Sequence, residues 1–249
     1  MNGSRSILLG AALLSLATVS ACSDATGTRR VPLSLSFATK SFAAKPSVSS
    51  PVGFTADLVV GTGSDLVITK AEVVIDGIEL SHDDGPNCDG TGEFHCEDVE
   101  QSAQLVDIPL NGLKTQLTVT VPEGSYQRLD AHIQVPESDD AGVTAFLAAH
   151  PDFKDVSVRV VGTYGPKKTP FTYTAPIDAK LELRFNPPLV VTSASNNITV
   201  DVDVASWFTD SSGAALDPTA PANAARIAAN IRASFNAFED DNEDGQSDK

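Results

Sequence analysis

Residues 68–80, Ile68-Thr-Lys-Ala-Glu-Val-Val-Ile-Asp-Gly-Ile-Glu-Leu80, are the part of the sequence that most strongly indicates the fold. The segment is rich in β-branched residues and mixes apolar with polar side chains in the manner of a half-buried strand. Gly77 lies inside it, and an isolated glycine within a strand pattern indicates a bulge or a kink. We therefore expect a long strand here, interrupted at Gly77, with one face on a hydrophobic core.

Further segments alternate apolar and polar residues with a period of two: residues 33–37, 117–121, 126–135, 156–160 and 198–204. Two hairpins are expected, one joining residues 156–164 to 169–174 and one joining the strands around Leu117 and Leu129. Many closely spaced strands without regular helices between them favour an antiparallel sandwich over a parallel α/β sheet. The predicted fold class is therefore mainly β, an antiparallel β-sandwich.

Two helices are expected to interrupt the strands. A short one follows the capping group Ser138-Asp139-Asp140 and ends at His150, because the residue before a proline disfavours helical dihedral angles. An amphipathic helix is predicted over about residues 221–238, where the apolar side chains recur at helical steps: Ile227, Ile231, Phe235 and Phe238. This stripe is expected to pack on the sandwich, and a partner-binding helix is the alternative.

The first 22 residues carry the features of an export signal. Arg5 precedes an apolar run from Ile7 to Val19, which is shorter than the ~20 residues that a membrane-spanning helix needs. The motif Val19-Ser20-Ala21-Cys22 resembles a bacterial lipobox. This resemblance implies that Cys22 becomes the acylated first residue of a lipoprotein, and more than one acyl chain gives stable anchoring. An ordinary secretory signal is the alternative.

The chain is accordingly divided into four parts: a signal peptide at residues 1–21, a tether at residues 22–31, a β-sandwich domain with a C-terminal helix at residues 32–238, and an acidic tail at residues 239–249. In lipoproteins of Gram-negative bacteria, an aspartate directly after the cysteine favours retention at the inner membrane. Ser23 occupies that position here. The predicted location is therefore the bacterial cell envelope, with a lipid anchor in the outer membrane.

The charge of the chain restricts its partners. Residues 1–21 contain one basic residue and no acidic one, so the chain from Cys22 onward has 16 basic and 33 acidic residues, a net charge of −17. Such a surface repels phosphate backbones, which argues against nucleic acid as a partner. It also opposes flat adsorption onto anionic lipid, which suits a domain that is held away from the membrane by a tether.

Cys88 and Cys96 are the two cysteines that remain beside Cys22. An exported protein folds in an oxidising compartment, so these two residues are predicted to form a disulfide across a short loop. A metal site that combines them with His82 and His95 is the alternative. The spacing differs from the tight ligand pairs that are usual for zinc.

Three segments together resemble a known group of proteins: Ile68 to Leu80, Leu105-Val-Asp-Ile-Pro-Leu110 and Glu123-Gly-Ser-Tyr126. They are similar to bacterial envelope lipoproteins of uncharacterised function that carry a transthyretin-like β-sandwich. The resemblance covers about residues 66–135, and it implies a sandwich of the immunoglobulin or transthyretin kind. The insertion at residues 82–101 and the C-terminal half depart from the pattern, so no active site is transferred.

Catalytic motifs are absent from the sequence: there is no GxSxG, HExxH, phosphate-binding loop or dinucleotide-binding glycine pattern. His132 lies between Ala131 and Ile133 in an alternating strand, so its side chain is expected to face away from the core row. His150 is expected at a helix C-terminus, where the helix dipole favours it.

The acidic tail contains the clearest pattern of ligands. Asp240, Asn242 and Asp244 have the spacing of the first half of a calcium loop, Gly245 supplies the turn and Gln246 its carbonyl oxygen. The chain ends at Lys249, before the position of the bidentate acid, so a calcium site here would be incomplete and weak. The pattern therefore favours a solvated acidic tail that frays beyond the last helix, and weak calcium binding is the alternative.

The function that follows from these features is that of a lipid-anchored envelope protein with a non-enzymatic binding or structural role and calcium as the candidate cofactor. Its partners would be the membrane, through Cys22, and an unidentified protein or glycan. One alternative is a carbohydrate- or protein-binding adhesin module that uses the acidic loop at residues 82–101, since long loops without a function are uncommon. Another is a hydrolase whose carboxylates converge only in the fold, one of them with a raised pKa.

Overall fold

The computed structural model describes residues 29–39, 57–61, 65–82, 96–99, 102–137, 141–194 and 196–248. Its strands are β1 (Arg30–Thr39), β2 (Leu58–Val60), β3 (Leu66–Ser81), β4 (Cys96–Val99), β5 (Gln104–Asp107), β6 (Leu113–Pro122), β7 (Gly124–Ile133), β8 (Val158–Tyr164), β9 (Thr169–Ala175), β10 (Ala179–Val191), β11 (Asn197–Val202) and β12 (Phe235–Glu239). Its helices are α1 (Ala141–Ala149), α2 (Val204–Trp207) and α3 (Ala224–Arg232), with short 3-10 turns at Pro151–Phe153 and Pro221–Asn223.

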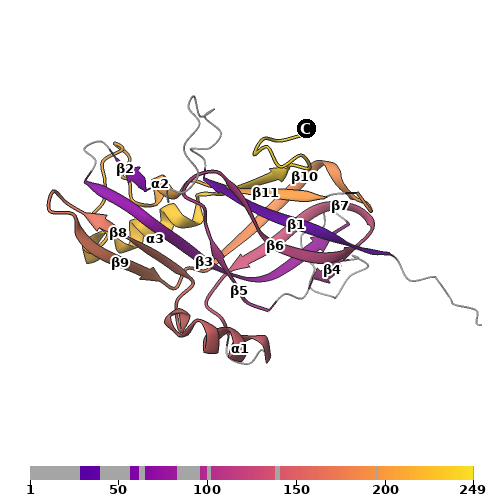
Figure 1. Cartoon of the computed structure of the whole chain (residues 1–249), viewed down its shortest axis with the longest axis horizontal. Coiled ribbons are helices and arrows are strands. Elements are labelled where there is room, and N and C mark those ends of the chain that lie inside the picture. Colours follow the sequence, from indigo (N-terminus) through magenta and orange to yellow (C-terminus); the bar gives the residue numbers. More distant parts are fainter. Residues whose placement is uncertain are drawn as a thin grey trace, which may run out of the picture.

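Two packed sheets confirm the predicted β-sandwich (Figure 1). The smaller sheet has the strand order β12-β11-β1-β6, and the larger one is built around β3. Pairing is antiparallel except between β1 and β11, which run parallel. The inner face of each sheet is apolar, and the two faces share one core in which Leu33, Phe37 and Ile198 of the small sheet are fully buried.

The long strand β3 organises the larger sheet. Val73 pairs with Val158 of β8 on one edge and with Val106 of β5 on the other, whereas Ile75 pairs with Ile133 of β7 and with Gln104 of β5. Strands β8 and β7 therefore lie end to end along one edge of β3, and β2, β5 and β4 follow one another along the other. One strand thus connects the two halves of the sheet.

The bulge predicted in β3 is confirmed. The pairing of β3 with β7 shifts between Asp76 and Ile78, and Gly77 between them has a φ of 75°. Glycine adopts a positive φ without the steric cost that a Cβ atom brings. The shift keeps Ile75 and Ile78 on the same, buried face.

Helices cover the sandwich at two places. Phe208, directly after α2, packs edge-on against Phe171 and Tyr173 of β9, with ring centroids 6.1 and 5.5 Å away, and α3 buries Ile227 and Ile231 in the same core. Helix α1 lies instead on the outer face of the large sheet (Figure 1). There Val143 and Phe146 of the helix form a second apolar cluster with Val74 of β3, Ala103 and Phe153.

The predicted helix over residues 221–238 is wrong in its second half. Helix α3 ends at Arg232, and Phe235 to Glu239 form β12, which pairs with β11. The helix and the strand are joined near Ser234. Ile227 and Ile231 lie four residues apart on the helix, whereas Phe235 and Phe238, which continue the same spacing in the sequence, belong to the strand. The free edge of β11 decides between the two structures, and sequence spacing alone does not reveal it.

The predicted hairpin between the strands at Leu117 and Leu129 is also wrong. Strand β6 pairs with β1 in the small sheet, whereas β7 pairs with β3 and β10 in the large one. The chain therefore crosses between the sheets at residues 122–124. The Tyr126 hydroxyl donates a 2.8 Å hydrogen bond to the Pro122 carbonyl and braces this crossing.

The other predicted hairpin is confirmed, since β8 and β9 pair from Val158 with Ala175 to Tyr164 with Thr169. Sequence analysis missed β10, which contains Pro187 and Pro188. Prolines argue against a strand because they cannot donate to its ladder. Here they fall where the pairing with β7 shifts, between Arg184 and Leu189, so no ladder hydrogen bond is needed from them.

Candidate functional site

Several predicted site residues lie outside the described part of the chain. Cys22 and Cys88 belong to this group, as does most of the loop at residues 82–101, and of Cys96 only the backbone, in β4, is described. Lipid attachment and the disulfide therefore stay predictions. Within the described ranges, the helices are all too short or too polar to span a bilayer.

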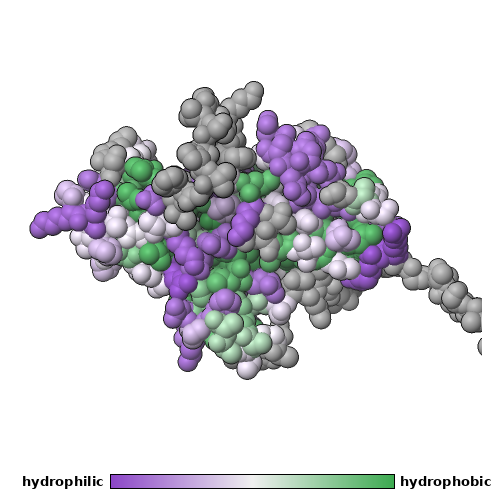
Figure 2. Space-filling view, in the orientation of Figure 1, coloured by the Kyte–Doolittle hydropathy of each residue, from purple (hydrophilic) through white to green (hydrophobic). Residues whose placement is uncertain are grey.

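The acidic tail folds back onto the small sheet instead of fraying. Asp240 is fully buried, and its Oδ2 atom accepts a 2.7 Å hydrogen bond from the Thr199 hydroxyl. Behind it lies a chain of buried polar groups, in which the Asn197 amide donates to the Asp240 carbonyl at 2.9 Å and Ser36 donates to Asn197 Oδ1 at 2.8 Å. Asp240 thus fixes the tail to β11. The residues after it form a hydrophilic patch at the top of Figure 2.

In the loop after Asp240, backbone amides donate hydrogen bonds to the side-chain oxygens that were predicted to bind calcium. The Asp244 amide donates to Asp240 Oδ1 and to Asn242 Oδ1, at 2.9 Å each, and the Gln246 amide donates to Asp244 Oδ1 at 2.9 Å. Asp248 closes the loop by accepting from Asn242 Nδ2 at 2.9 Å. Over the described ranges, however, three or more His, Cys, Asp or Glu side chains nowhere gather to hold a metal ion. Calcium at Asp240, Asn242, Asp244 and Gln246 stays a prediction from the spacing.

We expect calcium to raise the melting temperature of the protein relative to excess chelator. With the affinity of extracellular calcium modules, about 10⁻⁴ to 10⁻³ M, about 10 mM calcium adds about 1.4–2.7 kcal/mol to the free energy of unfolding. Asp244→Ala should abolish the increase. Glu243→Ala removes the same charge outside the ligand spacing and should retain it. An unchanged melt of the unmodified protein in calcium would contradict the prediction.

The three described histidines have ordinary surroundings. The His82 ring stacks on the Tyr126 ring, with centroids 4.3 Å apart, and its Nδ1 atom lies 2.7 Å from the Ser125 carbonyl oxygen. His132 is half-buried on the outer face of β7, opposite Lys180 and Asp76 in the register, while Ala131 and Ile133 are buried in the core, as predicted. His150 directly follows α1, and its ring lies 5.0 Å from that of Phe146. In the described structure, none of the three has a serine or cysteine side chain hydrogen-bonded to it, and no metal-binding group of side chains forms around them.

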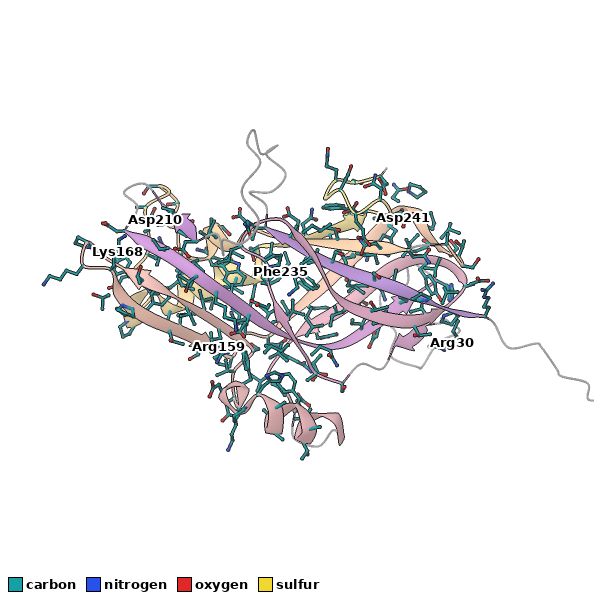
Figure 3. All side chains as sticks on the ribbon, in the orientation of Figure 1. Arg30, Arg159, Lys168, Asp210, Phe235 and Asp241 are labelled. Carbon is teal, nitrogen blue, oxygen red and sulfur yellow. The ribbon has the colours of Figure 1, made fainter. Side chains whose placement is uncertain are left out.

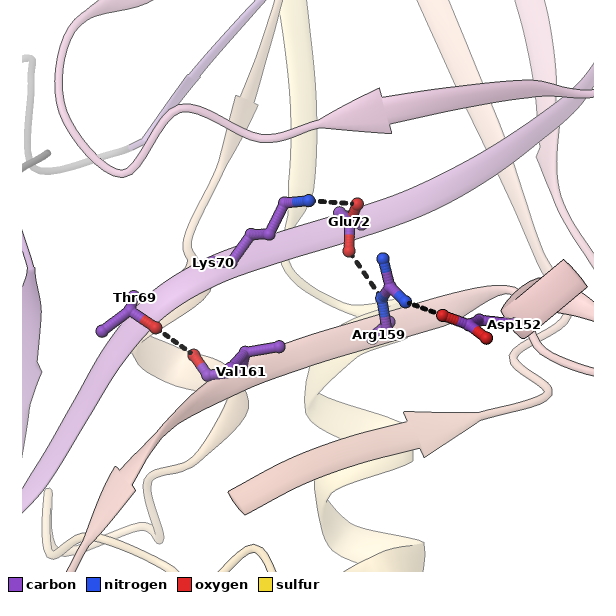
Figure 4. Close-up of polar contacts among 6 residues, drawn as sticks. All are labelled: Thr69, Lys70, Glu72, Asp152, Arg159 and Val161. Carbon is purple, nitrogen blue, oxygen red and sulfur yellow. Dashed lines mark hydrogen bonds and ion pairs between the residues drawn. The ribbon is translucent and has the colours of Figure 1, made fainter. Parts of the chain in front are cut away.

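A charged network lies on the outer face of the large sheet, beside α1 (Figure 4). The buried carboxylate of Glu72 is 2.7 Å from both Arg159 Nε and Lys70 Nζ, and Arg159 Nη1 reaches Asp152 at 2.9 Å. The guanidinium also lies over the Phe153 ring, 4.7 Å from its centroid, in a cation–π contact. Burial by itself raises the pKa of Glu72, but hydrogen bonds and charges from Arg159 and Lys70 outweigh burial and bring the pKa below its usual value.

Asp107 faces Glu72 across the pairing of β3 with β5. Asp107 is exposed at the surface, but partial desolvation by the surrounding protein, and secondarily the nearby charge of Glu72, raise its pKa against the opposing effects of Lys70 and Lys114. Two neighbouring carboxylates with divergent pKa values are one part of what the hydrolase alternative requires. The other part is a pocket, and neither residue lines any of the three clefts described next.

The first cleft, of about 450 Å³, lies where β11, α2, α3 and β12 meet. Six of its lining residues are polar: Asp201, Asp203, Ser206, Asn230, Ser234 and Asn236. Asp203 caps α2 by accepting from the Ser206 amide at 3.1 Å, and Asn230 donates to the Ser206 carbonyl at 2.9 Å. The Asn230 bond joins α3 to α2, so hydrogen bonding helps to hold this part of the cleft wall in place, which suits a preformed site.

Trp207 lies directly behind this cleft. It is the single tryptophan of the chain and is fully buried. Its indole N–H donates a 2.6 Å hydrogen bond to the hydroxyl of Ser234, and its ring lies 6.2 Å from the ring of Phe235. Both partners line the cleft, so a ligand there is expected to alter the surroundings of the indole. Figure 3 shows Phe235 near the middle of the molecule, well away from Asp241 in the tail.

The second cleft, of about 250 Å³, lies between β10 and β12 and shares Phe235 and Asn236 with the first. Lys180, Glu182 and Arg232 contribute charge to it, and Leu181, Leu183, Val200 and Ala237 contribute apolar surface. A third cleft, of about 410 Å³, borders the turn between β8 and β9 and is lined by Tyr164, Gly165, Pro166, Lys167, Thr169 and Thr219.

Sequence analysis did not identify the first cleft. Asp201 and Asp203 were visible as the polar positions of an alternating strand, which indicates only that they face away from the core. Their proximity to Asn230 and Asn236 depends on β12 pairing with β11, and the predicted continuous helix excluded that pairing. One local signal exists in the sequence: Trp207 follows these aspartates within six residues.

Comparisons with known proteins identify no family. No family model matches the chain, and no curated protein matches it. Among solved structures, it is similar to MbnP from Methylosinus trichosporium, with 16% sequence identity and a TM-score of 0.42 over 85% of this chain and 98% of that one. A likeness this distant carries no inference about function, and the fold and the clefts are known from this chain's own structure.

Proposed function

We propose that the protein is a non-enzymatic binding protein of the bacterial cell envelope, held at the membrane by a lipid on Cys22, and that its ligand is a small polar molecule in the first cleft. The observation that carries this proposal is the cleft itself. It combines a volume suited to a small ligand with six polar side chains from four structural elements. The signal sequence supports the tether, and the net charge of −17 suits a domain kept off anionic lipid.

The charged network around Glu72 is a weaker candidate for a binding site than the first cleft. The Glu72 network is satisfied internally, because each of its ion pairs joins residues of the fold to one another. The first cleft instead presents Asn236, whose side chain is exposed on β12 opposite Asp201. An amide donates and accepts hydrogen bonds, so Asn236 can meet a polar ligand from either direction.

We expect ligand entry to change the fluorescence of Trp207. The mature protein in detergent is titrated with a panel of amino acids, short peptides, sugars and polyamines, and one class should give a saturable change. Asn236→Ala should weaken that binding by about fivefold or more, the equivalent of about one hydrogen bond. Asn111→Ala, which removes an exposed asparagine between β5 and β6 that lines none of the three clefts, is the matched control.

Two outcomes would contradict the proposal. If no class changes the emission or the melting temperature, the cleft is not a binding site. If Asn111→Ala weakens binding as much as Asn236→Ala, binding takes place elsewhere. The tether is checked on the same preparation: the intact mass should correspond to an acylated chain that begins at Cys22, and Cys22→Ser should release the protein from the membrane fraction.

A further inference from the structure

Strand β10 forms one edge of the larger sheet. It is the first strand in the order β10-β7-β3-β8-β9, and among the described strands only β7 pairs with it in a ladder. The second cleft lies along this edge, between β10 and β12. The backbone at the edge of a sheet is a template on which a further strand can pair. The edge of β10 is therefore a place where another chain can extend the sheet.

The outer face of β10 carries charges of alternating sign. Lys180, Glu182 and Arg184 have side chains that are 44%, 39% and 55% exposed. Across the ladder with β7, Glu182 lies opposite Asp130. In the same register, Arg184 lies opposite Arg128. Like charges directly opposite one another destabilise a sheet. Glu182 and Arg184 pair with each other along β10 at 2.8 Å, but charges of opposite sign can face them across a ladder only from the outer side of β10.

This charge pattern is complementary to a second copy of itself. If two β10 strands run antiparallel about a two-fold axis at Leu183, Glu182 of each copy lies opposite Arg184 of the other. Opposite residues in an antiparallel pair have Cβ atoms about 4.5–5.5 Å apart, within reach of an ion pair. The four charged groups then alternate in sign around a square. An axis at Glu182 would instead place Lys180 opposite Arg184, which is repulsive.

The ends of β10 fit the same register. An axis at Leu183 places Pro188 of one copy opposite Asp178 of the other. Proline has no N–H group to donate to a ladder. The Asp178 carbonyl already accepts a 3.0 Å hydrogen bond from Arg232 Nε. The groups that are unsuited to a ladder thus meet at its two ends, and residues 180–186 remain for pairing. Moving the axis two residues toward the start of β10 would bring the Asp178 carbonyl inside the ladder.

The inner face of β10 adds apolar contacts. Leu181 and Leu183 are 8% and 9% exposed, among the highest values in the core, and Phe185 is half-buried. With the axis at Leu183, this leucine lies opposite its own copy, and Phe185 of each copy lies opposite Leu181 of the other. Leu181 also lines the second cleft, of about 250 Å³, together with the apolar side chains of Val200 and Ala237. The cleft therefore offers an apolar surface beside the added strand.

We propose that two copies of the protein associate through β10, which pairs antiparallel with itself about Leu183 and joins the two larger sheets into one. Main-chain hydrogen bonds hold an added strand, and its side chains select the register. Each copy has a net charge of −17 from Cys22 onward. At about 0.15 M salt the Debye length is about 8 Å, so repulsion between distant charges is screened more than the contacts at the axis. The ladder is short, so the copies associate at high protein concentration and separate in the dilute solutions in which unfolding is measured.

Light scattering of the mature protein, with detergent micelles in excess over protein, measures the protein mass of each particle. The unmodified protein should change from one copy to two as its concentration rises. Glu182→Arg and Arg184→Glu each bring like charges together across the axis, and each should weaken the association by about tenfold or more. Lys167→Glu makes the same change of charge as Arg184→Glu in the exposed turn between β8 and β9, and should leave the association unchanged.

A mixture of the two variants tests the register itself. The charge introduced by Glu182→Arg in one copy faces the charge introduced by Arg184→Glu in the other, so the mixed pair is again complementary. A one-to-one mixture should therefore associate as the unmodified protein does, which variants with a damaged fold would not do. The proposal is overturned if the unmodified protein stays a single copy at every concentration, or if both variants associate unchanged. It is also overturned if the mixture does not associate.

Discussion

Asp130→Ala is expected to lower the free energy of unfolding by about 3–5 kcal/mol, the usual cost of leaving one member of a buried ion pair without its partner. Asp130 Oδ2 lies 3.0 Å from Arg128 Nε, and the two side chains are 2% and 1% exposed. Lys180 reaches the same oxygen at 3.2 Å from the solvent side. Without Asp130, the Arg128 guanidinium stays charged and buried, because arginine does not shed its proton in proteins.

Denaturant unfolding monitored by circular dichroism measures this loss. The double variant Arg128→Met/Asp130→Leu removes both charges and should recover most of the stability, since apolar pairs of similar volume often replace buried ion pairs without loss. Glu182→Ala breaks the exposed pair of Glu182 with Arg184, at 2.8 Å, and should cost less than about 1 kcal/mol. If Asp130→Ala lowers the free energy of unfolding by less than Glu182→Ala does, the buried ion pair of Asp130 with Arg128 does not stabilise the fold.

Glu72→Gln is expected to cost about 2–3 kcal/mol at neutral pH, and this cost should disappear in acid. The substitution keeps the shape of the side chain but gives up the charge that pairs with Arg159 and Lys70 (Figure 4). Because the pKa of Glu72 is lower in the folded protein than in the unfolded chain, the folded state favours the ionised form. The stabilisation is therefore complete above the unfolded pKa of about 4.3 and is lost as pH falls through the folded value.

The measurement is the difference in unfolding free energy between the unmodified protein and the Glu72→Gln variant, taken at a series of pH values from neutral to strongly acidic. The difference should be constant above about pH 5 and should decrease below it, as the carboxylate protonates. Glu182→Gln is the matched control, since that glutamate pairs with an arginine at nearly the same distance but is exposed to solvent. A difference that grows as the pH falls would contradict the lowered pKa of Glu72.

Local sequence patterns predicted the strands well where one face meets the core. Leu33, Leu35 and Phe37 alternate with serines, and the structure places all three in the core. The bulge at Gly77 was predictable because it requires a positive φ, which glycine adopts more readily than any other residue. The hairpin from Val158 to Ala175 was equally predictable, since its turn and both strands are contiguous in the chain.

Predictions failed where partners come from distant parts of the chain. The crossing after Pro122 resembles a hairpin turn, and only the pairing of β6 with β1, which begins at Arg30, separates the two sheets. Phe235 and Phe238 extend a helical spacing, yet β11 offers an edge on which they form a strand. Pro187 and Pro188 concealed β10, because the register shift that accommodates them is a property of its pairing with β7.

The sequence by itself determined the mainly β architecture and the excess of negative charge, because periodicity and composition are local properties of the chain. It also supplied the lipobox-like motif at Cys22, which awaits its chemical test. Tertiary structure alone decided which polar residues meet. Asp201 and Asn236 are 35 positions apart and become neighbours only when β12 joins β11, and Asp240 becomes a buried anchor only when Thr199 faces it. The clefts depend on such long-range pairings, whose free energy comes from contacts that no local pattern encodes.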